Sequence, residues 1–171
     1  MDDQNSQDDI QKDRTQHPLD SNWMSGRRLL ELLPSRIEAV VEISRWSFIK
    51  RDSYGKFEFF SPLPTLYNYG SVRGYLGGDG QPLDAVVLGK RVKVGCSQML
   101  NVWGVVEFLD EGTWDHKLIL GASSLTCRCL PSFFFLYAAF KRTRAWIRGS
   151  SNQIRYLGIE KAKGRGGRFG D

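Results

Sequence analysis

The stretch from Asn68 to Leu88 constrains the fold most, because it joins a tight polar turn to a buried strand. It reads N-Y-G at 68–70, D-G-Q-P-L-D at 79–84 and A-V-V-L at 85–88. Gly and Pro between two aspartates make the backbone turn and keep it rigid. Both carboxylates then lie at the mouth of the strand, where they repel each other unless a cation lies between them. Magnesium suits such a site, since it takes oxygen ligands, keeps several waters and needs few protein groups.

Taken alone, this turn is more typical of a polar surface loop that precedes a strand. A second acidic cluster favours the metal site. Asp110 and Asp115, with Lys117 two residues further on, follow the apolar segment 102–109.

These motifs, D-G-Q-P-L-D at 79–84 and D-E-G-T-W-D-H-K at 110–117, resemble the soluble inorganic pyrophosphatases (family I). The family signature runs D-G-D-P-x-D and is followed by D-x-x-x-x-D-x-K. The N-Y-G at 68–70 is also a family feature at the expected distance. The resemblance covers roughly Val40 to Lys141, and it departs from the family at Gln81, where the family has a third loop aspartate.

The resemblance implies Mg²⁺ as the cofactor and a set of carboxylates as its ligands. Asp79, Asp84 and Asp115 would hold the primary metal, with Asp84 shared to a second ion. Asp110 and Asp115 would hold the ions that arrive with substrate. Glu42 would reach the cluster through water, although a solvent-facing glutamate on a half-buried strand explains that residue equally well.

The resemblance also implies that Lys50, Tyr69, Lys117 and Lys141 bind phosphate oxygens. Structural alternatives stay open for three of them. Lys50 beside an arginine is typical of a solvated surface pair, and a buried tyrosine needs a partner for its hydroxyl in any protein. A lysine near the end of a helix, as at Lys141, also complements the helix dipole.

Gln81 bears directly on activity. The resemblance implies that the family's aspartate at this position deprotonates the attacking water, and an amide cannot take a proton at neutral pH. General-base catalysis typically contributes about 10²–10⁴ in rate.

A phosphate-binding arginine of the family is also missing, since its position falls at or near Phe57. The expected function is therefore Mg-dependent hydrolysis of pyrophosphate to two phosphates with reduced activity; the alternatives are a non-catalytic phosphate- or nucleotide-binding module and a phosphohydrolase with an altered phosphoanhydride substrate.

The predicted fold is mainly β (α+β), a small five-stranded OB-like barrel with flanking helices and a disordered N-terminal tail. Short alternating strands with tight turns between Val40 and Leu120 favour a closed or nearly closed barrel. A short amphipathic helix is expected to begin at Gly26 and to stop at Pro34. A longer one is expected over 132–148, with Phe134, Tyr137, Ala138 and Ile147 on its apolar face, and the basic segment 90–94 is expected to be an edge strand.

The expected organisation is a disordered acidic tail over 1–22, one folded domain over 23–160 and a basic, glycine-rich tail over 161–171. The last of these is more typical of a flexible solubilising tail than of an RNA-binding segment. Hydrophobic residues make up 41% and charged residues 25% of the chain, the balance of an ordinary soluble protein.

Three cysteines, at 96, 127 and 129, show no paired framework and indicate reduced thiols. The longest apolar run, 133–140, is too short to span a bilayer. A cytoplasmic location is expected, with pyrophosphate as a small-molecule partner and neither membrane nor nucleic acid. Bacterial members of the family are commonly hexamers, so the resemblance leaves a homo-oligomer open, although the sequence shows no recognisable interface residues.

Overall fold

The computed structural model describes residues 25–51, 57–60, 64–78, 80–110, 113–121, 129–147 and 154–162; at 50–51, 57–60 and 144–146 only the backbone is described. The elements, in chain order, are α1 (Gly26–Leu32), β1 (Arg36–Ile43), β2 (Ile49–Arg51), β3 (Phe57–Phe60), β4 (Asn68–Leu76), β5 (Pro82–Val87), β6 (Ser97–Asp110), β7 (Thr113–Trp114), β8 (Lys117–Leu120), α3 (Leu130–Ile147) and β9 (Arg155–Lys161).

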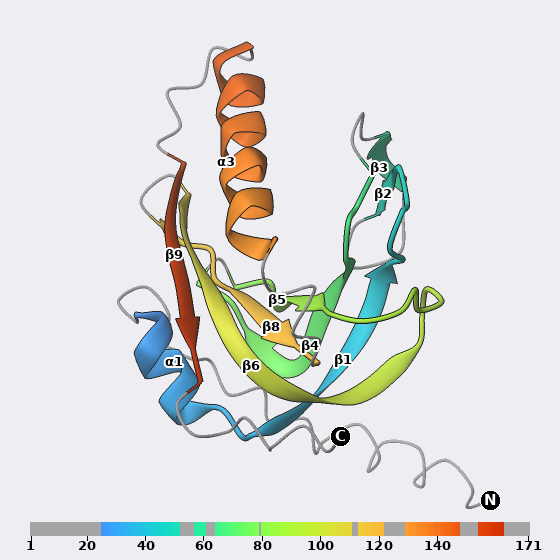
Figure 1. Ribbon diagram of the computed structural model, residues 1–171, viewed down its shortest axis with the longest axis vertical. Coiled ribbons are helices and arrows are strands. Elements are labelled where there is room, and N and C mark those ends of the chain that lie inside the picture. The colour runs from blue at the N-terminus through green and yellow to red at the C-terminus, as the bar shows by residue number, and fades with distance from the viewer. Residues whose placement is uncertain are drawn as a thin grey trace, which may run out of the picture.

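Five strands close into a barrel in the order β1-β4-β5-β8-β6, with β6 pairing back onto β1 (Figure 1). All neighbours are antiparallel except β5 and β8, which run parallel. The 14-residue β6 makes closure possible, because its first part pairs with β1 and its later part with β8 and β9. The prediction of a mainly β protein with a small five-stranded barrel is confirmed.

Side chains alternate between two apolar clusters on opposite sides of the β5–β8 pair. Leu83, Ala85 and Val87 point into the barrel, and Val86 points to the other side. In β8, Leu118 and Leu120 likewise face inward while Ile119 faces outward. Both faces of this parallel pair are therefore buried, which explains why its sequence is almost continuously apolar.

The two helices cover the barrel at different places. Leu29 and Leu30 of α1 join the interior cluster, and Leu33, directly after α1, joins it too. The helix α3 rises from the other end of the barrel (Figure 1), where Phe134 and Ala138 are buried in the outer cluster. The expectation that Ile147 belongs to the same apolar face is wrong, because α3 projects past the barrel and leaves this side chain 72% exposed.

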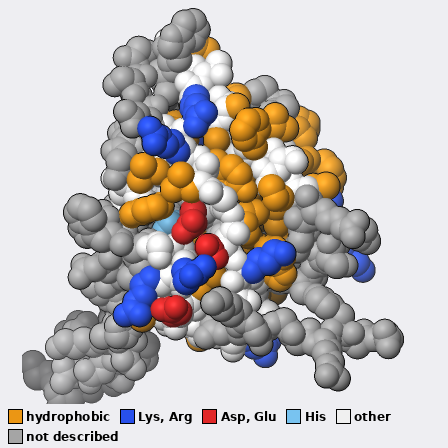
Figure 2. Space-filling model, turned by 60° about the vertical axis from the view of Figure 1, so that its left-hand side comes forward, with side chains coloured by type: hydrophobic (Ala, Val, Ile, Leu, Met, Phe, Trp, Pro, Cys, Tyr) orange, Lys and Arg blue, Asp and Glu red, His pale blue; other side chains and the backbone are white. Residues whose placement is uncertain are grey.

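Figure 2 shows apolar side chains gathered in a band over the upper half of one face of the molecule. Among the side chains of α3 that the structure describes, the exposed large apolar ones are Phe135, Leu136 and Ile147. None of the helices within the described ranges has the length and apolarity to cross a membrane.

The basic segment 90–94 is a loop and not the edge strand that its alternation predicts. Its backbone bonds to side chains instead, since Ser44 donates to the carbonyl of Val92 and the amide of Val92 donates to Asn68. The acidic tail at 1–22 and all but the first two residues of the basic tail at 161–171 lie outside the described part; Lys161 ends β9.

Candidate active site

The site begins with one cross-strand pair on the parallel strands. Asp84 of β5 and Lys117 of β8 are partners in register. Asp84 is on the same face of β5 as Val86, and Lys117 on the same face of β8 as Ile119, so both point toward the α3 side of the barrel. The apolar cluster under α3 therefore ends in a polar rim at this end of the strands.

Lys117 lies between two carboxylates. Its Nζ donates to Asp84 Oδ2 at 2.7 Å and to Asp115 Oδ1 at 2.8 Å. The lysine side chain is 3% exposed, whereas the two aspartates keep 32% and 25% of their side-chain surface. The cation that neutralises Asp84 in this structure is thus an ammonium group on the neighbouring strand.

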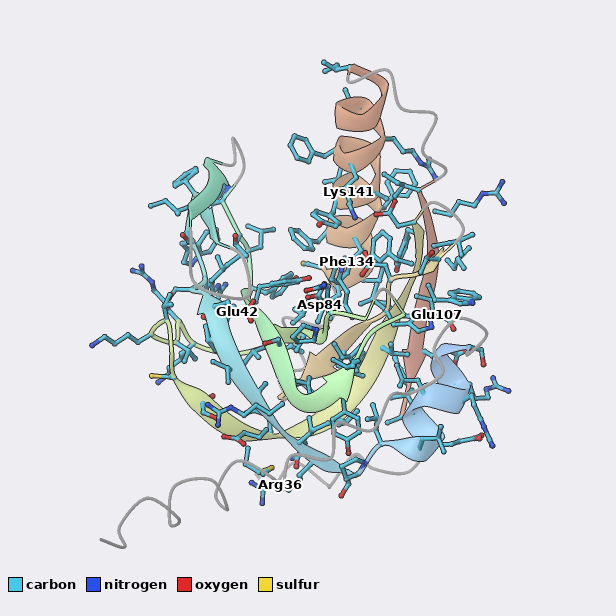
Figure 3. The ribbon with its side chains drawn as sticks, turned by 180° about the vertical axis from the view of Figure 1, so that it is seen from behind. Arg36, Glu42, Asp84, Glu107, Phe134 and Lys141 are labelled. Carbon is cyan, nitrogen blue, oxygen red and sulfur yellow. The ribbon has the colours of Figure 1, made fainter. Side chains whose placement is uncertain are left out.

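Lys141 brings α3 into the same network. Its Nζ donates to Asp110 Oδ2 at 2.6 Å and lies 3.5 Å from Asp115 Oδ2. Asp115 is therefore shared by both lysines, and the ion pairs connect β5, β8, the end of β6 and α3. Figure 3 shows Lys141 on α3 and Asp84 beneath the helix.

Two residues of β4 complete the described site. The hydroxyl of Tyr69 donates to Asp84 Oδ2, and Lys117 Nζ lies 5.8 Å from the centre of the Tyr69 ring. Ser71, two residues on and facing the same side, donates to Glu42 Oε1 at 2.6 Å. A Cβ at Gly70, between them, would collide with the carbonyl oxygen of Val40, so this position brings β4 unusually close to β1.

Burial and charge act against each other at the two lysines. Burial lowers the pKa of Lys117, but Asp84, Tyr69 and Asp115 outweigh it and hold the pKa well above its ordinary value. Burial also lowers the pKa of Lys141, yet its neighbours, Asp110 among them, raise it overall. Both ammonium groups therefore stay charged throughout the physiological range.

The pKa values of Tyr69 and Asp115 are shifted in opposite directions. Burial and then the adjacent Asp84 raise the pKa of Tyr69 well above its ordinary value, so the phenol stays protonated and donates. Burial works to raise the pKa of Asp115, but Lys117 and Lys141 more than compensate and lower it. Asp115 is a carboxylate at neutral pH.

The lowered pKa of Asp115 predicts a pH dependence of stability in metal-free protein. A depressed carboxyl pKa stabilises the fold above the unfolded-state value, about 3.9, and this contribution is lost as pH falls through the lower folded-state pKa. Urea unfolding in EDTA should show a smaller loss of stability between pH 6 and pH 3 in Asp115→Asn than in wild type. Equal losses in the two proteins would show that Asp115 is not coupled to the lysines.

The structure thus brings together six of the residues predicted for the site: Tyr69, Asp84, Asp110, Asp115, Lys117 and Lys141. Glu42 joins them on the adjacent strand through Ser71, and Figure 3 shows it at the end of β1. Gln81 is described and exposed. Asp79 and the side chain of Lys50 lie outside the described part of the chain.

Ser71 and Tyr137 reach the site although sequence reasoning assigned them no role in it. Ser71 follows Tyr69 by two residues on a strand, which places both side chains on one face. Tyr137 precedes Lys141 by four residues on a helix, which gives the same proximity. Both spacings are visible in the sequence, but neither residue belongs to the motifs that predicted the site.

The donor set fits a hard divalent cation. Asp84 Oδ2 and Asp115 Oδ1 both lie within 2.8 Å of Lys117 Nζ, so the lysine occupies the one place that both oxygens reach, and a metal ion would take the other carboxylate oxygens. Mg²⁺ needs only one or two carboxylates besides water and phosphate. Among the described residues, no three acidic, histidine or cysteine side chains are grouped closely enough to hold a metal by themselves.

A protein-family model for inorganic pyrophosphatase matches residues 39–126, just over half of the chain. The five-stranded barrel agrees with the fold of that class of enzyme. The chain belongs to the inorganic pyrophosphatase family.

Solved structures support the same fold at low sequence identity. The inorganic pyrophosphatase from Thermus thermophilus is similar with a TM-score of 0.63 at 18% identity, over 78% of this chain and 87% of that one. The inorganic pyrophosphatase from Neisseria gonorrhoeae is similar with a TM-score of 0.61 at 17% identity, over 83% of this chain and 90% of that one. The inorganic pyrophosphatase from Helicobacter pylori is similar with a TM-score of 0.56 at 23% identity, over 74% of this chain and 85% of that one. No curated protein matches the sequence significantly.

Proposed function

We propose that the protein hydrolyses inorganic pyrophosphate to two phosphates, with Mg²⁺ as cofactor and at a reduced rate. The observation that carries this proposal is the convergence of Asp84, Asp110 and Asp115 on two buried or half-buried ammonium groups. Such a cluster offers both signs of charge, as a metal–phosphate substrate requires. Family membership supports the same reaction.

Asp79, Asp84, Asp110 and Asp115 would hold the metal ions, with Glu42 next to them. Bound divalent ions supply Lewis-acid chemistry, since they polarise phosphoryl oxygens and make water more acidic. The hydroxyl of Tyr69 orients Asp84, and that of Ser71 orients Glu42. These hydrogen bonds hold the carboxylates in place before the ions arrive.

The lysines act on the phosphates. Lys117 and Lys141 carry permanent positive charge inside the site, where water screens it little. Donors held in position before the reaction stabilise charge that develops on the leaving phosphate. Lys50 would add a further donor from the β2–β3 hairpin.

Gln81 supports a second candidate, a phosphate-binding module without turnover. Its amide is exposed near the start of β5 and cannot accept a proton from water at neutral pH. The two candidates share the same metal and phosphate contacts. Only the release of phosphate separates them.

Binding of Mg²⁺ should stabilise the wild-type protein and depend on Asp84. At a hundredfold excess over Kd, a ligand adds about 2.7 kcal/mol, which corresponds to about 5–10 °C in Tm for a chain of this size. Asp84→Asn should lose most of this shift. The matched control is Glu38→Gln, which removes a carboxylate on β1 that bonds to Ser97 and Arg73 and not to the site. If Asp84→Asn keeps the full Mg²⁺ shift, the metal site is misplaced.

A further inference from the structure

The chain makes a tight turn directly after β1, and this turn displays a tryptophan. The amide of Ser47 donates to the carbonyl of Ser44 at 3.1 Å, so Arg45 and Trp46 are the two central residues of the turn. Trp46 has a φ of 67°, and among the described residues no other non-glycine residue has a positive φ. Such a turn position ordinarily takes glycine or asparagine. A bulky side chain there is strained, and strained backbone concentrates where a side chain has a functional role.

The turn holds the indole ring outward beside a fixed cation. Trp46 is 52% exposed, although its amide is anchored to the carbonyl of Thr65 at 2.6 Å. The guanidinium of Arg45 lies 5.0 Å from the centre of the indole ring, and its Nη1 donates to the carbonyl of Gly89 at 3.2 Å. A second exposed ring, Phe48, follows two residues later. An exposed aromatic ring next to a cation is a surface on which a nucleobase stacks well.

The basic loop between β5 and β6 lies next to this turn (Figure 1). Near the end of the loop, the amide of Gly95 donates to the carbonyl of Val41 in β1 at 2.8 Å. In its middle, the amide of Val92 donates to Asn68 Oδ1, which also accepts from the amide of Arg45. Turn and loop are therefore fixed to each other through one buried side chain. We call their combined surface the turn–loop surface; its members are Arg45, Trp46, Lys90, Arg91 and Lys93.

The cations of the turn–loop surface have no acidic partner in the part of the chain that the structure describes. Lys90, Arg91 and Lys93 are exposed. The ion pairs of the described residues lie elsewhere, on α1, between β1 and β4, and in the candidate active site. Four positive charges thus share one end of the barrel with an exposed tryptophan. Phosphates pair with such cations while bases stack on the ring.

We propose that the turn–loop surface binds single-stranded nucleic acid, with a base on Trp46 and phosphates on Lys90, Arg91 and Lys93. A single strand fits better than a duplex, because its bases are free to stack on a protein ring. The inference departs from the expectation, based on sequence, that nucleic acid is not a partner. It does so because the turn at Trp46 and the contact with the basic loop are features of the tertiary fold. It is independent of the proposed hydrolysis.

Fluorescence anisotropy measures this binding. The probe is a labelled, mixed-sequence RNA of about 12 nucleotides, within the range that an OB-fold covers, titrated with the full chain in EDTA. Trp46→Asn removes the ring and introduces a residue that tolerates the positive φ, and it should raise the Kd at least about fivefold. Trp46→Phe keeps a ring and should lose less. The matched control is Phe135→Ala, which removes a ring 65% exposed on α3 and should leave the Kd unchanged.

The salt dependence of the Kd tests the cations. For a single strand, the slope of log Kd against log salt changes by about 0.7 for each phosphate contact. Lys90→Gln combined with Lys93→Gln should therefore lower the slope by about 1.4. Its control is Arg27→Gln combined with Arg28→Gln, which removes two exposed charges of α1 that pair with carboxylates. This control should leave the slope unchanged.

Any of four results would overturn the proposal: no binding of the RNA by wild type, a wild-type Kd in Trp46→Asn, an equal fall in slope in the α1 control, or binding of heparin or duplex RNA as tight as that of the single strand. A fivefold loss in Trp46→Asn, with a Tm within a few degrees of wild type, would support it. The lysine variant changes only exposed side chains, so it tests the proposal even if Trp46→Asn unfolds.

Discussion

Replacing Lys117 with methionine is expected to destabilise the fold by about 3 kcal/mol, because it leaves Asp84 and Asp115 charged and facing each other without their shared cation. For a chain of this length the loss corresponds to a fall in Tm of about 6–12 °C. Methionine keeps most of the volume of the buried stem, so the effect reports the charge. Pyrophosphate turnover should fall with it, since we propose that the same ammonium group binds the phosphates.

Arg73→Met provides the comparison for that result. Arg73 also pairs with a carboxylate, Glu38, but at 3.9 Å and with 60% of its side chain exposed. Exposed pairs contribute about 0–1 kcal/mol, so this variant should unfold almost like wild type. Urea unfolding in EDTA at pH 7 measures both. Equal stabilities for the two variants would show that Lys117 is not the cation that holds the cluster together.

Replacing Gln81 with aspartate is expected to raise pyrophosphate turnover by about 10²-fold or more. The substitution supplies a group that can accept a proton from water, together with a further oxygen ligand for a metal. Gln81 is exposed, so the change should have little effect on the free energy of unfolding. Steady-state release of phosphate in the presence of Mg²⁺ compares the turnover of Gln81→Asp with that of wild type.

Gln81→Asn is the control for Gln81→Asp, since it shortens the side chain in the same way without adding a carboxylate. Its turnover should stay at the wild-type level. If the turnover of Gln81→Asp rises no more than that of Gln81→Asn, the missing arginine near Phe57 is the more serious change. The protein is then better described as a phosphate-binding module without turnover.

The alternation of apolar residues was enough to predict the barrel. The period of two in Ile37–Ile43 and the apolar runs at 85–88 and 102–109 correspond to β1, β5 and β6. The basic segment 90–94 alternates too but forms a loop. The loop conformation depends on hydrogen bonds to Ser44 and Asn68. Both residues are distant in sequence, so no local sequence pattern reveals these bonds.

The members of the site were easier to predict than their partners. The motifs pointed to Asp84, Asp115 and Lys117, but spacing along the chain does not reveal that the lysine pairs with both aspartates. That pairing follows from the parallel register of β5 and β8, a property of the tertiary fold. The expected metal between carboxylates and the observed ammonium group meet the same electrostatic need.

Tyr137 illustrates a different limit. Its helical spacing assigned it to the apolar face of α3, and its ring does pack there. A tyrosine at the edge of such a face has a polar end, and only the position of α3 relative to β6 determines what that end meets.

Phosphate release from pyrophosphate tests the central claim most directly, measured with Mg²⁺ and with EDTA for wild type, Gln81→Asp and Asp84→Asn. We expect slow release by wild type in Mg²⁺, faster release by Gln81→Asp, and none above background in EDTA or with Asp84→Asn. Release at background by both wild type and Gln81→Asp, in protein that binds Mg²⁺ and the pyrophosphate analogue imidodiphosphate, would contradict the assignment as a pyrophosphatase.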